Sequence, residues 1–127
     1  GEMLVEKNIT VNSTCEHHLL PIIGIAHVAY ISKGKVVGLS KINRIVDYYS
    51  RRPQVQERLT LQVVNELKKI LKTDDVACVI DAKHLCVNLR GIRDIQSSTV
   101  TTEFSGKLKE KEIKKEFLDY IKLEANL

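Results

Sequence analysis

Cys15-Glu16-His17-His18 places a thiol, a carboxylate and two imidazoles in four consecutive residues, just after a strand-like run from Leu4 to Val11. The run that follows, Pro21 to Ile31, is apolar and long enough for a second strand. A segment so rich in reactive side chains between two strands predicts a site loop, from Asn12 to Leu20, around which the rest of the chain is organised.

Cys15 and His18 are separated by two residues, so both side chains can turn back onto one tetrahedral ion. A second half-site lies far downstream, where His84 and Cys86 flank a leucine. Cys15, His18 and Cys86 together form a Cys2His set suited to zinc, and three protein ligands leave the fourth position for water, as in catalytic sites. His17 and His84 remain as unligated bases nearby.

The downstream half-site lies in a segment, Asp81 to Arg90, that alternates polar and apolar residues with a period of two. This alternation predicts a half-buried strand. The polar residues that would share one face of the strand are His84, Cys86, Asn88 and Arg90.

A closed structural zinc site, with Cys78 as its fourth ligand, is the alternative. Cys78 lies in the continuous apolar run Val76 to Ile80, where a thiol behaves as a small hydrophobic side chain. The open three-ligand site is therefore the favoured hypothesis.

Length and composition predict one compact domain, because the chain has 127 residues, of which 43% are hydrophobic and 28% charged. The sequence has neither a run of roughly 18 apolar residues that could span a membrane nor a signal peptide, so we expect a cytoplasmic protein without a membrane partner. The net charge is only +4 and the aromatic residues are not interleaved with arginines, which argues against nucleic-acid binding. A small polyanionic substrate remains possible.

The middle of the chain predicts a hairpin and then a helix. A turn at Ser32 to Lys35 would return the chain into Val36 to Gly38, and Ser40 would cap a helix that ends near Ser50. Lys41 and Arg44 would share a face of the first turn of this helix. A helix N-terminus beside two cations is a natural phosphate site, although a solvated basic face is the simpler interpretation.

A second, long helix is predicted to contain Pro53 in its first turn, with Val55, Leu59, Val63, Leu67 and Ile70 on the buried side. Gln56 and Glu57 lie near its start, where an amide and a carboxylate could contact a base edge or simply face solvent. Beyond the strands at Val76 to Ile80 and Asp81 to Arg90, we expect a β-branched strand from Ser97 to Phe104 and an amphipathic C-terminal helix.

Four motifs in this order resemble GTP cyclohydrolase I. They are Cys15-Glu-His-His-Leu-Leu-Pro21, Gly38-Leu-Ser-Lys-Ile-Asn-Arg44, Arg52-Pro-Gln-Val-Gln-Glu-Arg-Leu-Thr60, and His84-Leu-Cys86 followed by Arg90-Gly91. The resemblance runs through nearly the whole chain and implies a single catalytic domain over residues 1–127. The chain begins almost at the first strand, so we expect the helical N-terminal region usual in this family to be absent.

The fold that the resemblance implies is the α+β tunnelling fold: an antiparallel four-stranded sheet with helices on one side, assembling into a barrel ring. It also implies a homo-oligomer, most simply a decamer of two stacked pentamers. The implied reaction is the zinc-dependent hydrolysis of GTP to formate and 7,8-dihydroneopterin triphosphate, the first step toward folates and biopterin. Water would attack C8 of guanine, the imidazole ring would open, and formate would leave.

The resemblance also implies a role for each matching residue. Cys15, His18 and Cys86 correspond to the zinc ligands, and His17 and His84 to the proton-transfer pair. Gln56 and Glu57 correspond to the guanine-binding pair, Ser40 to the residue at the ribose, and Lys41, Arg44 and Arg90 to the triphosphate clamp. Two alternatives stay open: a related tunnelling-fold enzyme for another purine or pterin, and a zinc-stabilised binding module without catalysis.

Overall fold

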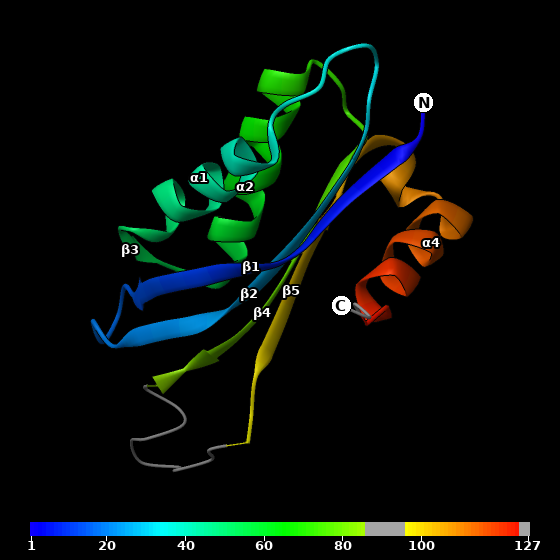
Figure 1. Cartoon of the computed structure of the whole chain (residues 1–127). Coiled ribbons are helices and arrows are strands. Elements are labelled where there is room, and N and C mark those ends of the chain that lie inside the picture. Colours follow the sequence, from blue (N-terminus) through cyan, green and yellow to red (C-terminus); the bar gives the residue numbers. More distant parts are fainter. Residues whose placement is uncertain (86–95, 125–127) are drawn as a thin grey trace.

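The computed structural model describes residues 1–85 and 96–124 of the chain (Figure 1). In chain order the described elements are β1 (Met3–Cys15), β2 (Pro21–Ile31), α1 (Leu39–Ser50), β3 (Pro53–Gln54), α2 (Gln56–Leu71), β4 (Val76–His84), β5 (Thr99–Phe104), a 3-10 helix (Gly106–Lys109) and α4 (Lys111–Lys122). Over these residues, no helix combines the length and the apolar character needed to cross a membrane. The mixed α+β class expected from the sequence is confirmed.

The described strands form one sheet in the order β3-β1-β2-β4-β5. The four longer strands pair antiparallel, as predicted, whereas the two-residue β3 pairs parallel with the end of β1, at Thr14 and Cys15. The sheet therefore has one short strand more than the predicted four. Gly24 is required where β2 meets β4, because a Cβ there would lie 2.2 Å from the carbonyl oxygen of Asp81.

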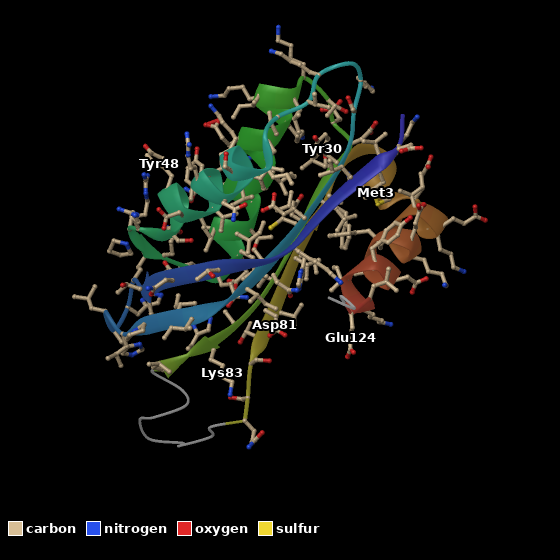
Figure 2. The ribbon with its side chains drawn as sticks, in the orientation of Figure 1. Met3, Tyr30, Tyr48, Asp81, Lys83 and Glu124 are labelled. Atoms are coloured by element: carbon tan, nitrogen blue, oxygen red, sulfur yellow. The ribbon has the colours of Figure 1, made fainter. Side chains whose placement is uncertain are left out.

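The two faces of the sheet carry different helices (Figure 1). Val28 and Tyr30 of β2 belong to the core under α1 and α2, whereas the alternate residues Ala29 and Ile31 pack with Phe117 of α4 on the other face. Tyr30 and Met3 mark these two sides of the sheet (Figure 2). The expectation of helices on one side thus holds for α1 and α2 but not for α4.

The hairpin forms in a different place from the one expected. β1 continues beyond Val11 to Cys15 and pairs with β2, and the chain reverses at the site loop itself. Val36 to Gly38, predicted as the returning strand, is a loop. The physical reason is that β1 and β4 already occupy both edges of β2, so this β-branched run has no edge left to pair with.

Both helix starts differ from the predictions. Gly38, not Ser40, occupies the N-cap of α1, and Ser40 lies in its first turn without capping the helix. Pro53 lies in β3 rather than in a helix, and α2 begins at Gln56 after Val55. A two-residue edge strand tolerates proline, because the missing N–H removes little of the ladder.

The downstream site segment is only partly a strand. Val76 to His84 is one continuous strand, β4, and the strand ends before Leu85, which has helical geometry. Cys86, Asn88 and Arg90 lie outside the described residues. The strand before α4 is present from Thr99 rather than Ser97, and the predicted C-terminal helix is confirmed.

Candidate metal centre and substrate site

The Cys15 to Leu20 turn is fixed by the backbone. The amide of Cys15 donates to the carbonyl oxygen of Leu20 at 2.8 Å, and the amide of Leu19 donates to that of Cys15 at 2.8 Å. The amide of Glu16 donates to the carbonyl oxygen of Gln54 in β3 at 3.0 Å. The turn is thus held at a defined position while the side chains of His17 and His18 stay exposed to solvent.

Cys15 and His18 come together as the sequence predicts. The Cys15 thiol is 8% exposed, and its Sγ lies 4.0 Å from Nδ1 of His18. In a tetrahedral zinc site, with the usual Zn–S and Zn–N lengths, a sulfur and a nitrogen ligand are about 3.6 Å apart. The pair therefore fits one shared ion after a small adjustment. The described residues contain no group of three His, Cys, Asp or Glu that could hold a metal, and the third predicted ligand, Cys86, lies beyond them.

Cys78 is too far from this pair to be a fourth ligand. Cys15 precedes the start of β2, whereas Cys78 pairs with Val28, seven residues along β2 from Pro21, which corresponds to about 23 Å at the usual strand rise. Burial also raises the pKa of the Cys78 thiol to about 12, so it stays protonated at neutral pH. The closed structural site with Cys78 is therefore wrong.

A side-chain network behind the turn was not anticipated from the sequence. Arg58 of α2 donates to Glu16 Oε1 at 3.3 Å and to Gln54 Oε1 at 3.1 Å. Gln54 is buried, and its amide nitrogen donates to the carbonyl oxygen of Tyr49 at 2.7 Å and to Gln62 Oε1 at 2.8 Å. This network connects the turn to both α1 and α2. Its members are common helix-surface residues, so no sequence signal could have singled them out.

His84 ends β4 at the same end of the sheet as the turn. It pairs with Ile22, which in turn pairs with Ser13 of β1. His84 is therefore two strands away from β1, or about 10 Å at the usual strand spacing. The structure thus brings His84 to within the width of a small substrate of the end of β1.

The surroundings of His84 are partly buried and hydrogen-bonded. Its Nε2 lies 2.6 Å from Oε1 of Gln56, the first residue of α2. Burial lowers the pKa of His84, and the nearby Glu57 carboxylate partly opposes this effect. Glu57 itself is exposed, as a carboxylate that contacts a substrate must be.

The predicted phosphate-binding residues lie elsewhere in this chain. Ser40, Lys41 and Arg44 are exposed in the first half of α1. The side-chain amide of Asn43 in α1 faces the Glu6 carboxylate of β1, and Glu6 is nine residues before Cys15. Glu6 pairs with Val28, seven residues along β2 from Pro21, which corresponds to about 23 Å at the usual strand rise. The structure therefore does not bring these three residues to the turn of the same chain.

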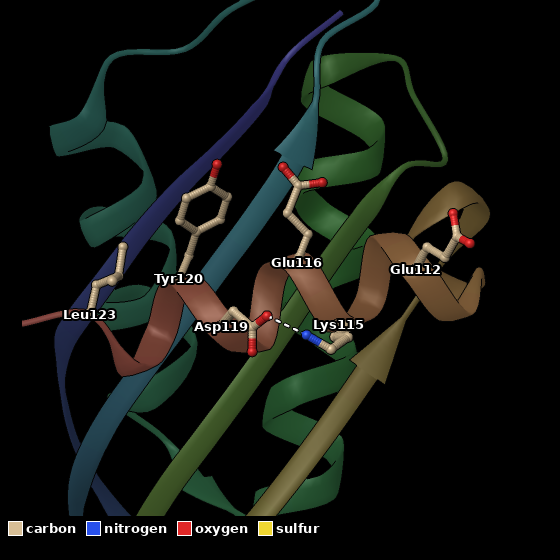
Figure 3. Close-up of a pocket in the computed structure, with 6 residues that line it drawn as sticks. All are labelled: Glu112, Lys115, Glu116, Asp119, Tyr120 and Leu123. Atoms are coloured by element: carbon tan, nitrogen blue, oxygen red, sulfur yellow. Dashed lines mark hydrogen bonds and ion pairs between the residues drawn. The ribbon is translucent and has the colours of Figure 1, made fainter.

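Two surface hollows lie on the helices, away from this end of the sheet. One, of about 330 Å³, lies between α1 and α2 and is lined by Lys41, Arg44, Ile45, Tyr48, Tyr49, Glu66 and Ile70. The other, of about 370 Å³, follows the outer face of α4 (Figure 3) and is lined by Glu112, Lys115, Glu116, Asp119, Tyr120 and Leu123. Neither lining includes a thiol or an imidazole, so the candidate site remains the open end of the sheet.

Known proteins are similar to this chain over most of its length. The sequence model of the GTP cyclohydrolase I family matches residues 1–122. A protein named GTP cyclohydrolase 1 from Flavobacterium johnsoniae is 77% identical over 125 residues, and one from Aeromonas salmonicida is 52% identical over 122 residues. These matches cover 98% and 95% of this chain but 56% of each relative, so the chain spans about half the length of the curated relatives it matches.

The fold is also found in a solved structure of low sequence similarity. The apo crystal structure of an archaeosine synthase, QueF-Like, matches with a TM-score of 0.69 at 18% identity, over 84% of this chain and 95% of that one. The molecule therefore has the tunnelling fold, with a cysteine and histidine site at one end of its sheet. Within that class, the chain belongs to the GTP cyclohydrolase I family.

Proposed function

We propose that this protein hydrolyses GTP to formate and 7,8-dihydroneopterin triphosphate with the help of zinc, in the cytoplasm, at the first step toward folates or biopterin. The observation that carries the proposal is the approach of Cys15 Sγ to His18 Nδ1 at the end of the sheet where His84 also lies. Membership of the family supplies the substrate and the reaction.

Cys15, His18 and Cys86 would hold the zinc ion. When bound, zinc supplies a Lewis acid and makes hydroxide accessible near neutral pH. The donor set suits zinc, because one thiol and one imidazole already approach to 4.0 Å. Cys86 comes two residues after His84, which ends the strand that carries the second half-site. The network behind Glu16 would keep the turn in place before the ion binds.

The proton transfers and the recognition of guanine are assigned to side chains at the same end of the sheet. His17 and His84 would move protons to and from the purine, since imidazoles titrate closest to neutral pH. The Glu57 carboxylate would accept hydrogen bonds from the N1 and N2 hydrogens of guanine. Its closeness to His84, seen in the effect on the His84 pKa, is consistent with one substrate contacting both.

The ribose and the triphosphate would be bound by Ser40, Lys41, Arg44 and Arg90. In one chain Asn43, which lies between Lys41 and Arg44, faces Glu6 of β1 and not the turn, so we propose that a neighbouring subunit supplies the first three. β1 and β5 are the outer long strands of the sheet, and β3 covers β1 only at Thr14 and Cys15. These edges suit a closed ring of identical subunits, which we propose is a decamer of two stacked pentamers.

The deciding experiment combines three measurements on the purified protein: formate released from GTP, fluorescence of the oxidised pterin, and zinc content. We expect all three to be positive. Turnover of another purine or pterin instead of GTP would favour a related tunnelling-fold enzyme. Zinc without any turnover would favour a binding module. A stable monomer by light scattering would contradict the shared site.

A further inference from the structure

Gln56 is the most completely hydrogen-bonded side chain near the candidate site. It is 1% exposed at the start of α2. Its amide nitrogen donates to the carbonyl oxygen of Thr99 at 2.9 Å, to Oγ1 of Thr101 at 3.0 Å and, at a longer 3.2 Å, to the carbonyl oxygen of Ile80. Its amide oxygen faces Nε2 of His84 at 2.6 Å.

These partners fix which way the amide is turned. The carbonyl oxygens of Ile80 and Thr99 can only accept, so the group that faces them must be the NH2 and not the oxygen. The hydrogen bonds of the Thr60 and Thr101 hydroxyls are consistent with this orientation of the amide. Thr60 donates to the carbonyl oxygen of Gln56 at 2.9 Å, which leaves its Oγ1 to accept from Thr101 at 2.8 Å. Thr101 Oγ1 then has its lone pairs free for the Gln56 NH2.

The orientation of the amide decides the tautomer of His84. Because Oε1 of Gln56 can only accept, Nε2 of His84 must carry the hydrogen in the 2.6 Å contact. In the neutral ring the lone pair is then on Nδ1. The same bond persists after Nδ1 takes up a proton, since Nε2 is a donor in both forms of the ring.

We propose that Gln56 is a positioning residue that holds His84 as the Nε2–H tautomer, with Nδ1 as its proton acceptor, instead of contacting guanine through its amide. The inference rests on the proposed function for its catalytic consequence. A side chain with 1% exposure and no uncommitted amide hydrogen would have to give up bonds to Thr99 or Thr101 before it could bind a base. Recognition of the guanine edge is then left to the exposed Glu57.

This arrangement differs from a carboxylate–histidine pair in one chemical respect. A carboxylate would both orient the ring and stabilise its cation, whereas a neutral amide oxygen orients the ring with little charge stabilisation. Gln56 therefore keeps His84 aligned without placing a negative charge beside the ring.

The test is Gln56→Met, which keeps the length of the side chain and removes both the donor and the acceptor. Solid-state 15N spectra of the histidine-labelled zinc protein report the tautomer directly, and a His84→Asn sample identifies the His84 signals. We expect His84 to lose its pure Nε2–H signature in Gln56→Met. We also expect kcat to fall about 10- to 100-fold, the usual loss when the partner that orients a histidine is removed, with KM little changed.

Two further variants make the result decisive. Gln62→Met removes an amide from the same helix that binds Gln54 instead of His84, and must leave the His84 signals unchanged. Gln56→Glu retains an oxygen opposite Nε2 and is expected to keep the Nε2–H signature, so it tests the inference even if Gln56→Met fails to fold. An unchanged tautomer in Gln56→Met, loss of the Nε2–H signature in Gln56→Glu, or a rise in KM without a fall in kcat would overturn the inference. Absence of GTP turnover in the unmodified zinc protein would instead refute the proposed function, because the spectra do not depend on turnover.

Discussion

The two histidine-bearing half-sites at this end of the sheet are built in opposite ways. His17 and His18 lie on a turn whose backbone is hydrogen-bonded but whose imidazoles are exposed, with their rings 6.4 Å apart. His84 lies on a strand against a buried amide with a fixed orientation. The exposed imidazoles of the first half-site are therefore positioned mainly by the backbone of the turn, whereas His84 is positioned by a hydrogen bond from its own ring.

The two described cysteines show the same difference. Cys15 lies beside His18 at the end of β1, while Cys78 is fully buried in the sheet and burial raises the pKa of its thiol to about 12. A thiol can serve as a ligand only where the thiolate is accessible. Position in the sheet, and not residue type, separates the two.

The largest effect is expected from Cys15→Ser, which should abolish both zinc binding and activity. Two remaining ligands cannot hold the ion in a site already open to water. Elemental analysis and the formate assay measure the two losses. The matched control is Cys78→Ala, which should retain zinc; loss of zinc in the control as well would mean that the metal depends on the whole sheet.

The second largest loss of activity is expected when the proposed proton-transfer groups, His17 and His84, are removed. His17→Ala and His84→Ala are expected to keep zinc and to lose about 10²- to 10⁴-fold in kcat, the usual contribution of a positioned acid or base. Zinc content measured alongside kcat separates this from a ligand role. If His17→Ala lost zinc and His18→Ala kept it, the assignments of ligand and base would have to be exchanged.

A smaller effect should separate recognition of the base from recognition of the phosphates. Glu57→Gln replaces an acceptor with a mixed donor and acceptor, so we expect GTP affinity to fall by about 1 to 3 kcal/mol at every ionic strength. Lys41→Ala should weaken GTP binding mainly at low salt, because salt screens a phosphate contact. Binding measured over a salt series tests this, and parallel curves for the two variants would count against Glu57 as the guanine contact.

The smallest effect concerns His27, which is structural and serves as a reference for the other histidines. It is 5% exposed and its Nδ1 accepts from the amide of Asn8 at 3.1 Å. Burial, and secondarily the charge of Lys7, lowers its pKa. The unfolded chain therefore binds the His27 proton more readily than the folded chain. The contribution of His27 to the free energy of unfolding is complete above the unfolded-state pKa near 6.5, and it is lost as the pH falls through the lower folded-state pKa. Unfolding by denaturant at several pH values measures this, and His27→Gln should flatten the dependence.

Much of the fold could be predicted from the sequence, because its signals are local. The spacing of Cys15 and His18 predicted their meeting, and the buried stripe of α2 at Leu59, Val63 and Leu67 is as expected. The sequence predicted the hairpin in the wrong place because Val36 and Val37 favour a strand by residue type. They do not join the sheet, because β1 and β4 already pair with the two edges of β2.

The features of the fold and of the site that the sequence did not predict depend on contacts between distant segments of the chain. α4 lies on the far face of the sheet because Ala29 and Ala77 are small enough for Phe117 to pack against them, which no periodicity reveals. The role inferred for Gln56 requires Thr99 and Thr101, more than forty residues later in the chain. The separation of Lys41 from Cys15 likewise appears only when α1 is placed along β1.

The outer side of β1 has a thermodynamic consequence. From Met3 to Ser13 no described strand pairs with β1 on that side, and the backbone has the extended geometry that pairs with another strand, except at Asn8, whose φ is 61° where the register with β2 shifts. If a second copy binds there, part of the free energy of folding comes from association, and it follows the law of mass action. Dilution alone should then lower the melting temperature, at constant pH and salt.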